Sequence, residues 1–407
     1  MVFACLLTAL GLGVAACGSS SSSGGGGGTS LTVYSSLPLQ GASRPQSEDV
    51  IKGEKLALQQ AGGKVGKYTI KYTSLDDATA AAGKWDPGAT AANARKAAQD
   101  KSTIAYLGEF NSGASAISIP ILNEAGILQI SPSNTAFGLT KSGPGADKGE
   151  PDKYYPTGKR TYARPVPIDN IQGKAMANFM KDEGVTKVYV LNDKEVYGQG
   201  VAHFTEEAAK AVGIQVVGTD GWDGNAANYR ALASKIKGTG ADAVFLGGID
   251  ANNGIQLFKD LGAAMPNAKL FGPDGMATNG IASGLPTAVQ AQAYLTAPTL
   301  DPKEYPPAGQ KFYKDFEAAY NVSASQIDPY AIYGYETMSL LLDAIKRAGD
   351  KGNDRQAVID AVFSTKDRSS VLGTYSIDKF GDTTLSSYGS FTVKGGKLVY
   401  NKTFQAS

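Results

Sequence analysis

Short apolar runs alternate with amphipathic stretches along most of this chain. The runs at 31–36, 68–75 and 102–110 contain Val, Ile, Leu, Thr and Tyr and have the length of β-strands. The first two are followed by stretches with helical spacing, at 47–62 and 89–100. Strands that alternate with helices in this way predict a parallel sheet that is covered by helices on both faces.

The same rhythm continues to residue 133 and restarts after a break. A helix is expected at 113–126, although Pro120 interrupts its pattern, and a strand at 127–133. Residues 141–159 are rich in Gly, Pro and charged side chains, which predicts a long surface loop. The second series has helices at 169–184, 198–213, 225–240 and 253–262, and strands at 186–193, 214–220, 241–248 and 268–275. Two series separated by one break predict two similar α/β lobes.

The last third of the chain departs from this alternation. Helices are expected at 306–321 and 328–349, and Asp328 is expected to cap the second of them. A strand is expected at 373–378, and the segment 389–400 is predicted to form a β-hairpin around its paired glycines.

The amino-terminal segment is typical of an exported protein. An apolar run at 3–16 ends in the sequence VAAC, whose last residue is Cys17. The run is shorter than the roughly 20 residues that a membrane-spanning helix needs, so residues 1–16 are predicted to be a signal peptide. VAAC resembles a bacterial lipobox, which implies lipidation of Cys17. Residues 17–30 then form a flexible Ser/Gly linker between the anchor and the folded body.

The composition excludes several classes of function. The formal net charge is +1, which gives no argument for a nucleic-acid partner. His203 is the single histidine, and Cys5 and Cys17 are the two cysteines, both upstream of the folded body. A histidine-based metal site or catalytic triad is therefore not expected, and neither is a cofactor. No G-x-S-x-G motif is present, so an amidase or esterase is also not expected.

Polar residues gather at the carboxyl ends of the predicted strands, where open α/β sheets bind ligands. Ser112, Ser133 and Thr135 offer hydroxyl groups at turns that suit a carboxylate. Asp250 and Asp274 offer carboxylates that suit an ammonium group. Two walls with opposite preferences match an amino acid zwitterion. Helix caps and turns favour the same residue types, so a purely structural role stays open, above all for Asp250.

Four stretches carry a resemblance to a known family. They are IAYLGEFNSGASAISIPILNEAGILQISPSNT (104–135), VYVLNDKEVYGQG (188–200), ADAVFLGG (241–248) and LFGPDG (270–275). In their order and spacing the chain resembles the extracytoplasmic solute-binding proteins of ABC transporters, in the branched-chain amino acid branch of the type I periplasmic-binding fold.

The resemblance implies an α/β fold of two Rossmann-like lobes with a cleft between them and a hinge of three crossings. Lobe one is expected to comprise residues 31–163 and 298–371. Lobe two is expected to comprise residues 164–297 and 372–407.

The resemblance also assigns ligand contacts. The expected ligand-binding residues are Ser112, Ser133, Asn134, Thr135, Tyr197, Asp250, Asp274 and Tyr330. Ser112 and the turn at 133–135 are expected to hold the ligand carboxylate, and Asp274 the α-ammonium. Tyr197 is expected to close on the ligand from lobe two, and Tyr330 to line the side-chain pocket. The loop before the first helix lacks the family's aromatic residue; Arg44 or Gln46 is nearest, which leaves a second acidic group on the ligand open.

The function implied is capture rather than catalysis. A monomer tethered outside the cytoplasm would bind a small amino acid-like ligand by lobe closure and deliver it to the permease subunits of an ABC importer. Two alternatives stay open. The same fold could act as a ligand-sensing module, or the ligand could be a carboxylic acid without an amine, such as an aromatic acid.

Overall fold

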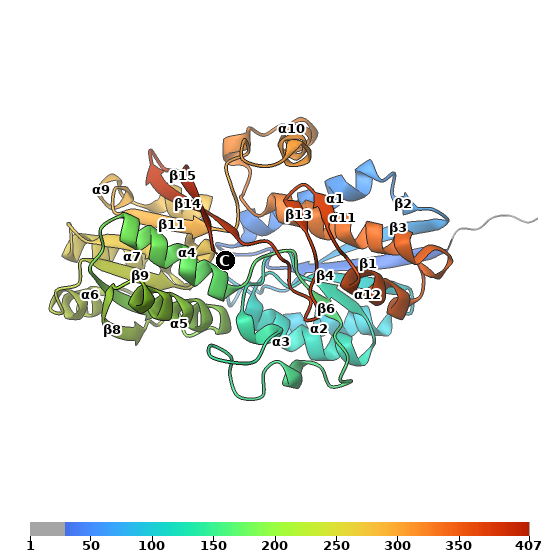
Figure 1. Cartoon of the computed structure of the whole chain (residues 1–407), viewed down its shortest axis with the longest axis horizontal. Coiled ribbons are helices and arrows are strands. Elements are labelled where there is room, and N and C mark those ends of the chain that lie inside the picture. Colours follow the sequence, from blue (N-terminus) through green and yellow to red (C-terminus); the bar gives the residue numbers. More distant parts are fainter. Residues whose placement is uncertain (1–28, 407) are drawn as a thin grey trace, which may run out of the picture.

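Two sheets of mostly parallel strands, each packed between helices, form two lobes (Figure 1). The computed structural model describes residues 29–406. The first sheet has six strands in the order β2-β3-β1-β4-β5-β6, and only β2 runs antiparallel to its neighbour. Its strands are β1 (Ser30–Leu37), β2 (Lys64–Val65), β3 (Tyr68–Asp76), β4 (Thr103–Gly108), β5 (Leu128–Ile130) and β6 (Tyr162–Ala163).

Helices cover both faces of the first sheet because successive residues of its central strands place apolar side chains on opposite faces. Val33 points into a core shared with one group of helices, whereas Tyr34 points into a core shared with the other. One face carries α1 (Arg44–Gln60), α11 (Ala331–Ala348) and α12 (Arg355–Phe363), and the other carries α2 (Pro87–Gln99) and α3 (Ser112–Glu124).

The second sheet has seven strands in the order β15-β14-β11-β10-β9-β7-β8. Five are parallel, and the carboxyl-terminal hairpin adds two antiparallel strands at one edge. The strands are β7 (Lys187–Asn192), β8 (Gln215–Gly221), β9 (Ala243–Gly247), β10 (Lys269–Gly272), β11 (Ala293–Ala297), β14 (Ser387–Lys394) and β15 (Lys397–Gln405). One face carries α4 (Asp169–Asp182) and α5 (Val196–Ala211), and the other carries α6 (Arg230–Lys237), α7 (Gly254–Ala264), α8 (Asn279–Gly284) and α9 (Thr287–Gln290).

Several short elements complete the chain. Helix α10 (Pro307–Tyr320) packs against α1 and α11, and a small two-stranded sheet joins β12 (Arg368–Ser370) to β13 (Gly373–Tyr375). The 3-10 turns are η1 (Phe137–Leu139), η2 (Asp152–Tyr154), η3 (Asp250–Asn252), η4 (Asp274–Met276), η5 (Ala324–Gln326) and η6 (Gly349–Lys351).

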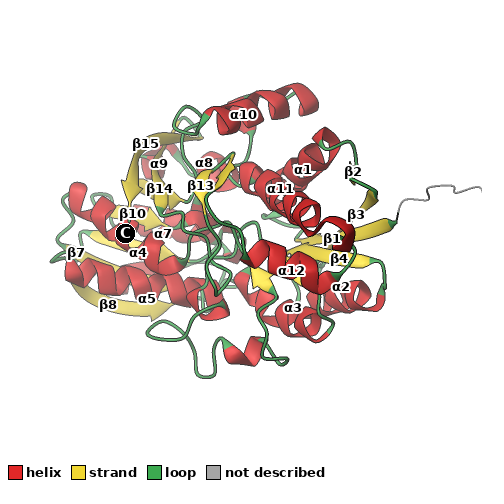
Figure 2. Cartoon of the chain, turned by 45° about the vertical axis from the view of Figure 1, so that its right-hand side comes forward, coloured by secondary structure: helices red, strands yellow, loops and turns green. Residues whose placement is uncertain are grey.

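The chain passes between the two lobes three times. The passages follow β6, β11 and β13, and Figure 2 shows loops gathered between the lobes. Tyr375 and Ile377 still pack in the core of the first lobe, a few residues beyond the expected third crossing. The predicted fold class is confirmed, whereas the residue boundaries of the lobes stay a prediction.

Three details differ from the expectations. Helix α11 begins at Ala331 and not at Asp328. The carboxylate of Asp328 accepts the N–H of Tyr330, and the chain makes one turn before the helix starts. The segment 141–159 is more than a surface loop, since Tyr154 is buried and its hydroxyl donates to the carboxylate of Glu150 at 2.5 Å. Strand β11 and helix α12 carried no clear signal in the sequence.

The membrane-related predictions fall mostly outside the described part. Cys17 and the signal peptide lie before residue 29. Among residues 29–406, the helices lack the length and apolar content that a bilayer crossing requires.

Candidate ligand-binding site

Asp274 stands where the two lobes meet. It opens η4, directly after β10 of the second sheet, and its side chain is buried. Tyr197, from α5 of the same lobe, donates its hydroxyl to Asp274 Oδ1 at 2.5 Å. Tyr330, at the start of α11 in the first lobe, donates to Oδ2 at 2.5 Å. Burial raises the pKa of Asp274, and the two tyrosine hydroxyls oppose that rise. Asp274 therefore links the lobes through one carboxylate.

A second buried acid, Asp169, lies beside this carboxylate. It is the first residue of α4, its N–H donates to the carbonyl of Thr135 at 2.9 Å, and both of its carboxylate oxygens lack a partner among the described residues. Burial raises the pKa of Asp169 to about 7; the Thr135 hydroxyl opposes the rise, and the charge of Asp274 adds to it. The Oε1 atom of the nearby Gln172 is also unpartnered. Such a cluster of acceptors favours a cationic group.

Sequence reasoning missed Asp169. An acid at the first position of a predicted helix is usually explained by capping and by the helix dipole, so it raises no suspicion. The available signal was its place in the segment that joins the two α/β series, because residues at a lobe crossing lie near any cleft between the lobes.

The turn after β5 belongs to the first lobe and forms the other wall of the site. Thr135 is the buried residue of this turn that brings a hydroxyl group to the wall. The N–H groups of Ser133 and Asn134 both donate to Ser131 Oγ, at 3.2 and 2.9 Å. The Ser133 hydroxyl donates to the carbonyl of Phe110 at 2.7 Å. Thr135 Oγ1, in contrast, is buried without a partner among the described residues. Thr135 is thus the member of this turn whose hydroxyl makes no hydrogen bond of good geometry, and it lies close enough to Asp169 to lower the pKa of that carboxyl.

Asn134 and Ser112 hold this wall together. The Asn134 amide donates to the carbonyls of Glu109 and Phe110, and its oxygen accepts from the Tyr162 hydroxyl at 3.0 Å. Ser112 Oγ accepts the N–H of Ala136 at 3.3 Å. These bonds tie the turn after β4 to the turn after β5. The hydroxyl hydrogen of Ser112 keeps its capacity to donate to a carboxylate.

A buried ion pair orients the same turn from behind. Arg164 is fully buried and donates to Asp382 Oδ1 at 2.8 Å. Its guanidinium also donates to the carbonyls of Asn134 and Ala136, at 3.1 and 2.9 Å. Because these carbonyls point at Arg164, the backbone of the turn is held in one orientation. The partners are 218 residues apart, and the sequence showed no sign of the pair.

Asp250 lines a narrow cavity at the mouth of the interface. Its Oδ2 atom accepts from the Thr278 hydroxyl at 2.9 Å, and burial raises its pKa to about 6. The facing wall includes Gln46, whereas Arg44 pairs with Glu48 on the exposed side of α1. The structure therefore gives no support to an arginine that would meet a second acidic group of the ligand.

A further set of contacts joins the lobes at the rim. Lys84, between β3 and α2, donates to Glu195 Oε1 at 2.9 Å and to Asn252 Oδ1 at 2.6 Å. Trp85 Nε1 donates to Glu195 Oε2 at 3.0 Å. Glu195 occupies the N-cap position of α5 in the second lobe, but its side chain makes no capping bond; both of its oxygens accept from the first lobe instead. From the sequence alone, Trp85 was interpreted as a structural residue beside a turn, and Lys84 was not singled out.

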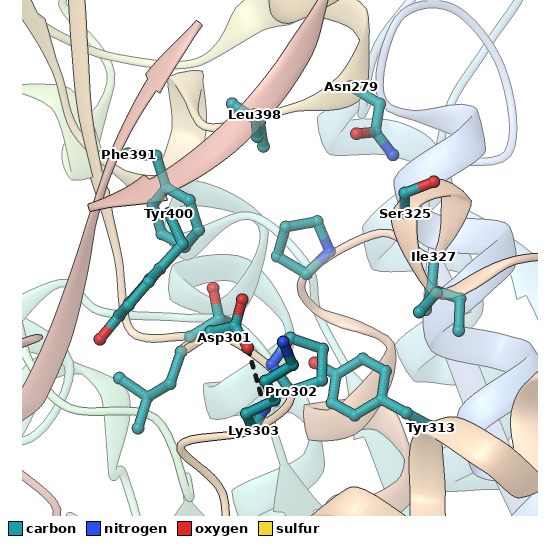
Figure 3. Close-up of a pocket in the computed structure, with 14 residues that line it drawn as sticks. Asn279, Asp301, Pro302, Lys303, Tyr313, Ser325, Ile327, Phe391, Leu398 and Tyr400 are labelled. Atoms are coloured by element: carbon teal, nitrogen blue, oxygen red, sulfur yellow. Dashed lines mark hydrogen bonds between the residues drawn. The ribbon is translucent and has the colours of Figure 1, made fainter. Parts of the chain in front are cut away.

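A larger hollow lies elsewhere, where the β14–β15 hairpin faces α10. Figure 3 shows this cavity, of about 370 Å³, with the side chains of Tyr313, Ile327, Leu398 and Tyr400 around it. Its walls are largely apolar and include none of the eight expected ligand-binding residues. The largest concentration of unpartnered polar groups near the expected residues lies instead between the lobes, around Asp169, Gln172 and Thr135.

Replacing Asp169 by a residue that cannot ionise tests whether burial makes its charged form unfavourable. An unfolded aspartate has a pKa of about 3.9, so the native state holds the extra proton between about pH 4 and pH 7, and stability falls as the pH rises through that window. Asp169→Asn cannot ionise. It is expected to melt a few degrees above the ligand-free wild type at pH 8, and the difference between the two melting temperatures is expected to shrink as the pH falls towards 4. Asp152→Asn, at an exposed position, is the control and should change neither melt. Equal pH dependence in Asp169→Asn and the wild type would contradict the assignment.

With this geometry in view, the comparisons with known proteins are informative. The family model described as periplasmic binding protein matches residues 35–397. A Leu/Ile/Val-binding protein homolog 2 of Brucella abortus is 28% identical over 362 residues, which cover 88% of this chain and 89% of that protein.

Solved structures agree on the fold. The chain is similar to a leucine-binding protein of Thermotoga maritima, with a TM-score of 0.79, 22% identity, and coverage of 92% of this chain and 99% of that one. It is also similar to a Rhodopseudomonas palustris solute-binding protein in complex with benzoate, with a TM-score of 0.76, 21% identity, and coverage of 92% and 96%.

Fold, interlobe site and family match define a solute-binding protein of the type I periplasmic-binding fold. The chain belongs to the periplasmic binding protein family. The resemblance seen in the sequence is confirmed.

Proposed function

We propose that this protein captures a small amino acid-like ligand between its lobes and delivers it to an ABC importer. The observation that carries the proposal is the pairing of opposite walls. Asp274 and Asp169 present carboxylates from the second lobe, whereas Thr135 and Ser112 present hydroxyl groups from the first. A molecule with an ammonium and a carboxylate group satisfies both walls at once. The Leu/Ile/Val-binding relatives support the same ligand class.

The same contacts explain how a ligand would stabilise the closed arrangement of the two lobes. A ligand stabilises the closed form only to the extent that it interacts more strongly with that form than with the open one. An ion held by groups of both lobes meets this condition, because opening would separate its partners. The proposal places the protein outside the cytoplasm as a monomer tethered by lipidated Cys17, which would keep it near the permease subunits.

A second candidate is a ligand without an amine. Both oxygens of Asp274 already accept tyrosine hydroxyls, which partly satisfies this carboxylate without a cation. The benzoate-bound structural neighbour supports such a ligand class. The unpartnered oxygens of Asp169 favour the amino acid, because an ammonium group gives an ionised carboxylate a stronger, charge-assisted hydrogen bond than a neutral donor does.

Titration calorimetry would distinguish an amino acid ligand from a ligand without an amine. The common L-amino acids and their amine-free analogues would be titrated into the purified folded body at pH 7.5. At least one amino acid is expected to bind with a Kd of about 1 μM or tighter, about −8 kcal/mol, and its amine-free analogue at least about 100-fold more weakly. Tighter binding of the amine-free acids would favour the second candidate. No binding in either series would reject the proposal.

A further inference from the structure

A narrow cavity between the lobes is lined by nine residues, five of which have polar side chains. From the first lobe it is lined by Ser43, Gln46 and Asn111, and from the second by Asp250 and Thr278. The remaining lining residues are Ala42, Phe110, Ile249 and Gly275. The cavity holds about 10 Å³, close to the minimum for one water molecule. The walls are thus nearly in contact, and a ligand must enter while the lobes are apart.

Two of the polar groups in this cavity have no partner. Gln46 is 6% exposed, and its Nε2 atom makes no hydrogen bond of good geometry within the described part of the chain, although its side chain lies close enough to Asp328 to lower the pKa of that carboxyl. Asn111 is 7% exposed, and its Oδ1 atom is likewise unpartnered. A buried polar atom without a hydrogen-bond partner destabilises the folded protein. One reason for a protein to retain such unpartnered atoms is that a bound ligand supplies their missing hydrogen bonds.

Asp250 adds a third site of hydrogen bonding. Only its Oδ2 atom has a bond, from Thr278, and its carboxylate is 8% exposed on the cavity wall. An aliphatic side chain placed here would leave the carboxylate and both amides unpaired. A polar side chain would satisfy them, whichever way each amide group is turned.

The cavity lies next to the Asp274 cluster in the structure. Gly275 lines the cavity, and its N–H donates to the Tyr197 hydroxyl at 3.1 Å. The same hydroxyl donates to Asp274. A ligand whose amine lies at Asp274 would therefore direct its side chain toward Gln46, Asn111 and Asp250.

We propose that Gln46, Asn111 and Asp250 select a ligand whose side chain is polar and uncharged, an amide or a hydroxyl, over the aliphatic side chains of Leu, Ile and Val. The inference rests on the proposed function and specifies its ligand class. An amide or hydroxyl side chain offers a donor to Asp250 and Asn111 and an acceptor to the Gln46 amide. Sites built to hydrogen-bond a substrate reject analogues that lack the polar group.

Near-isosteric ligand pairs test the selectivity. Calorimetry with the full chain would compare asparagine with leucine, threonine with valine, and glutamine with methionine. In at least one pair the polar member is expected to bind at least about tenfold more tightly, since an unmatched buried polar group weakens binding by that much or more. Binding of each aliphatic member as tightly as its polar partner would overturn the inference. Tighter binding of lysine than of all the neutral polar ligands would also overturn it.

Two substitutions test whether Asn111 and Asp250 produce the selectivity for a polar side chain. Asn111→Leu and Asp250→Asn are each expected to lower the affinity for the preferred polar ligand at least about fivefold. Neither should weaken an aliphatic ligand of the same length. A purely structural role would weaken both ligands together, and would overturn the assignment. Thermal melting of each variant shows that it folds; if Asn111→Leu does not fold, the Asp250→Asn result decides.

The failure of this inference is distinguishable from that of the proposed function. If amino acids bind but the aliphatic members bind as well as the polar ones, only the selectivity of this cavity is rejected. If no amino acid binds, the proposed function itself fails.

Discussion

Asp274→Asn is expected to lower the affinity for the amino acid ligand at least about 100-fold, because removing one member of a buried charge pair costs about 3–5 kcal/mol. The substitution preserves the shape of the side chain, and the amide oxygen can still accept from a tyrosine. What it removes is the negative charge that meets the ammonium group. Calorimetry with wild type and variant measures the loss.

The stability of the ligand-free variant separates a binding role from a structural one. Burial raises the pKa of Asp274, so the folded state gains little from its charge. The melting temperature of Asp274→Asn without ligand should therefore equal or exceed that of the wild type at pH 7.5. A large drop would make Asp274 a structural residue. Asp152→Asn, whose side chain is exposed, should leave both affinity and melting temperature unchanged.

Tyr330→Phe is the matched variant for the interlobe part of this effect. It removes the hydroxyl that reaches Asp274 from the first lobe and leaves the charge of Asp274 in place. Its loss of affinity is therefore expected to be smaller than that of Asp274→Asn. An equal loss would show that the bond between the lobes, and not the charge, carries the binding.

The second large effect is expected at the rim contacts of Lys84 and Glu195. These bonds exist only when the lobes are together, so each stabilises the closed form. Apparent affinity scales with the fraction of molecules that can close. Lys84→Ala and Glu195→Ala should each weaken ligand binding about tenfold, equivalent to about 1.4 kcal/mol. Small-angle scattering should show a larger radius of gyration for the ligand-free variants than for the wild type.

The double variant and a control complete this experiment. Because Lys84 and Glu195 are bonded to each other, the effects of the two substitutions should not add. Lys210→Ala removes a lysine that pairs with Glu206 and Glu207 on the outer side of α5, away from the interface, and should change nothing. Wild-type affinity and scattering in Lys84→Ala would show that the rim contacts do not govern closure.

The two regions act on different parts of the same equilibrium. In the proposed function Asp274 and Asp169 interact with the ligand, so their removal is expected to weaken the ligand's preference for the closed form. Lys84 and Glu195 interact with each other, so their removal disfavours closure whether or not a ligand is present. Comparing ligand-free scattering of the two sets of variants distinguishes these contributions.

The sequence by itself determined the fold class and the order of the elements. Apolar periodicity near 2 or 3.6 residues depends on neighbouring positions, so most of the strands and helices of both lobes could be predicted locally, with β11 and α12 as exceptions. The hairpin at 389–400 was also predictable, because its paired glycines mark the turn between β14 and β15. Candidate polar residues at strand ends followed from the topology rule for parallel sheets.

Only the tertiary structure decided which of these residues meet. The hydroxyls that reach Asp274 come from Tyr197 and Tyr330, 77 and 56 residues away in the sequence. Asp169 looked like an ordinary helix start until folding buried it beside Asp274 without a partner. Spacing along the chain carries no information about such contacts, because they depend on how two independently packed lobes approach each other. The physical chemistry of the site, its shared hydrogen bonds and shifted pKa values, therefore arises at the interface and not in either lobe alone.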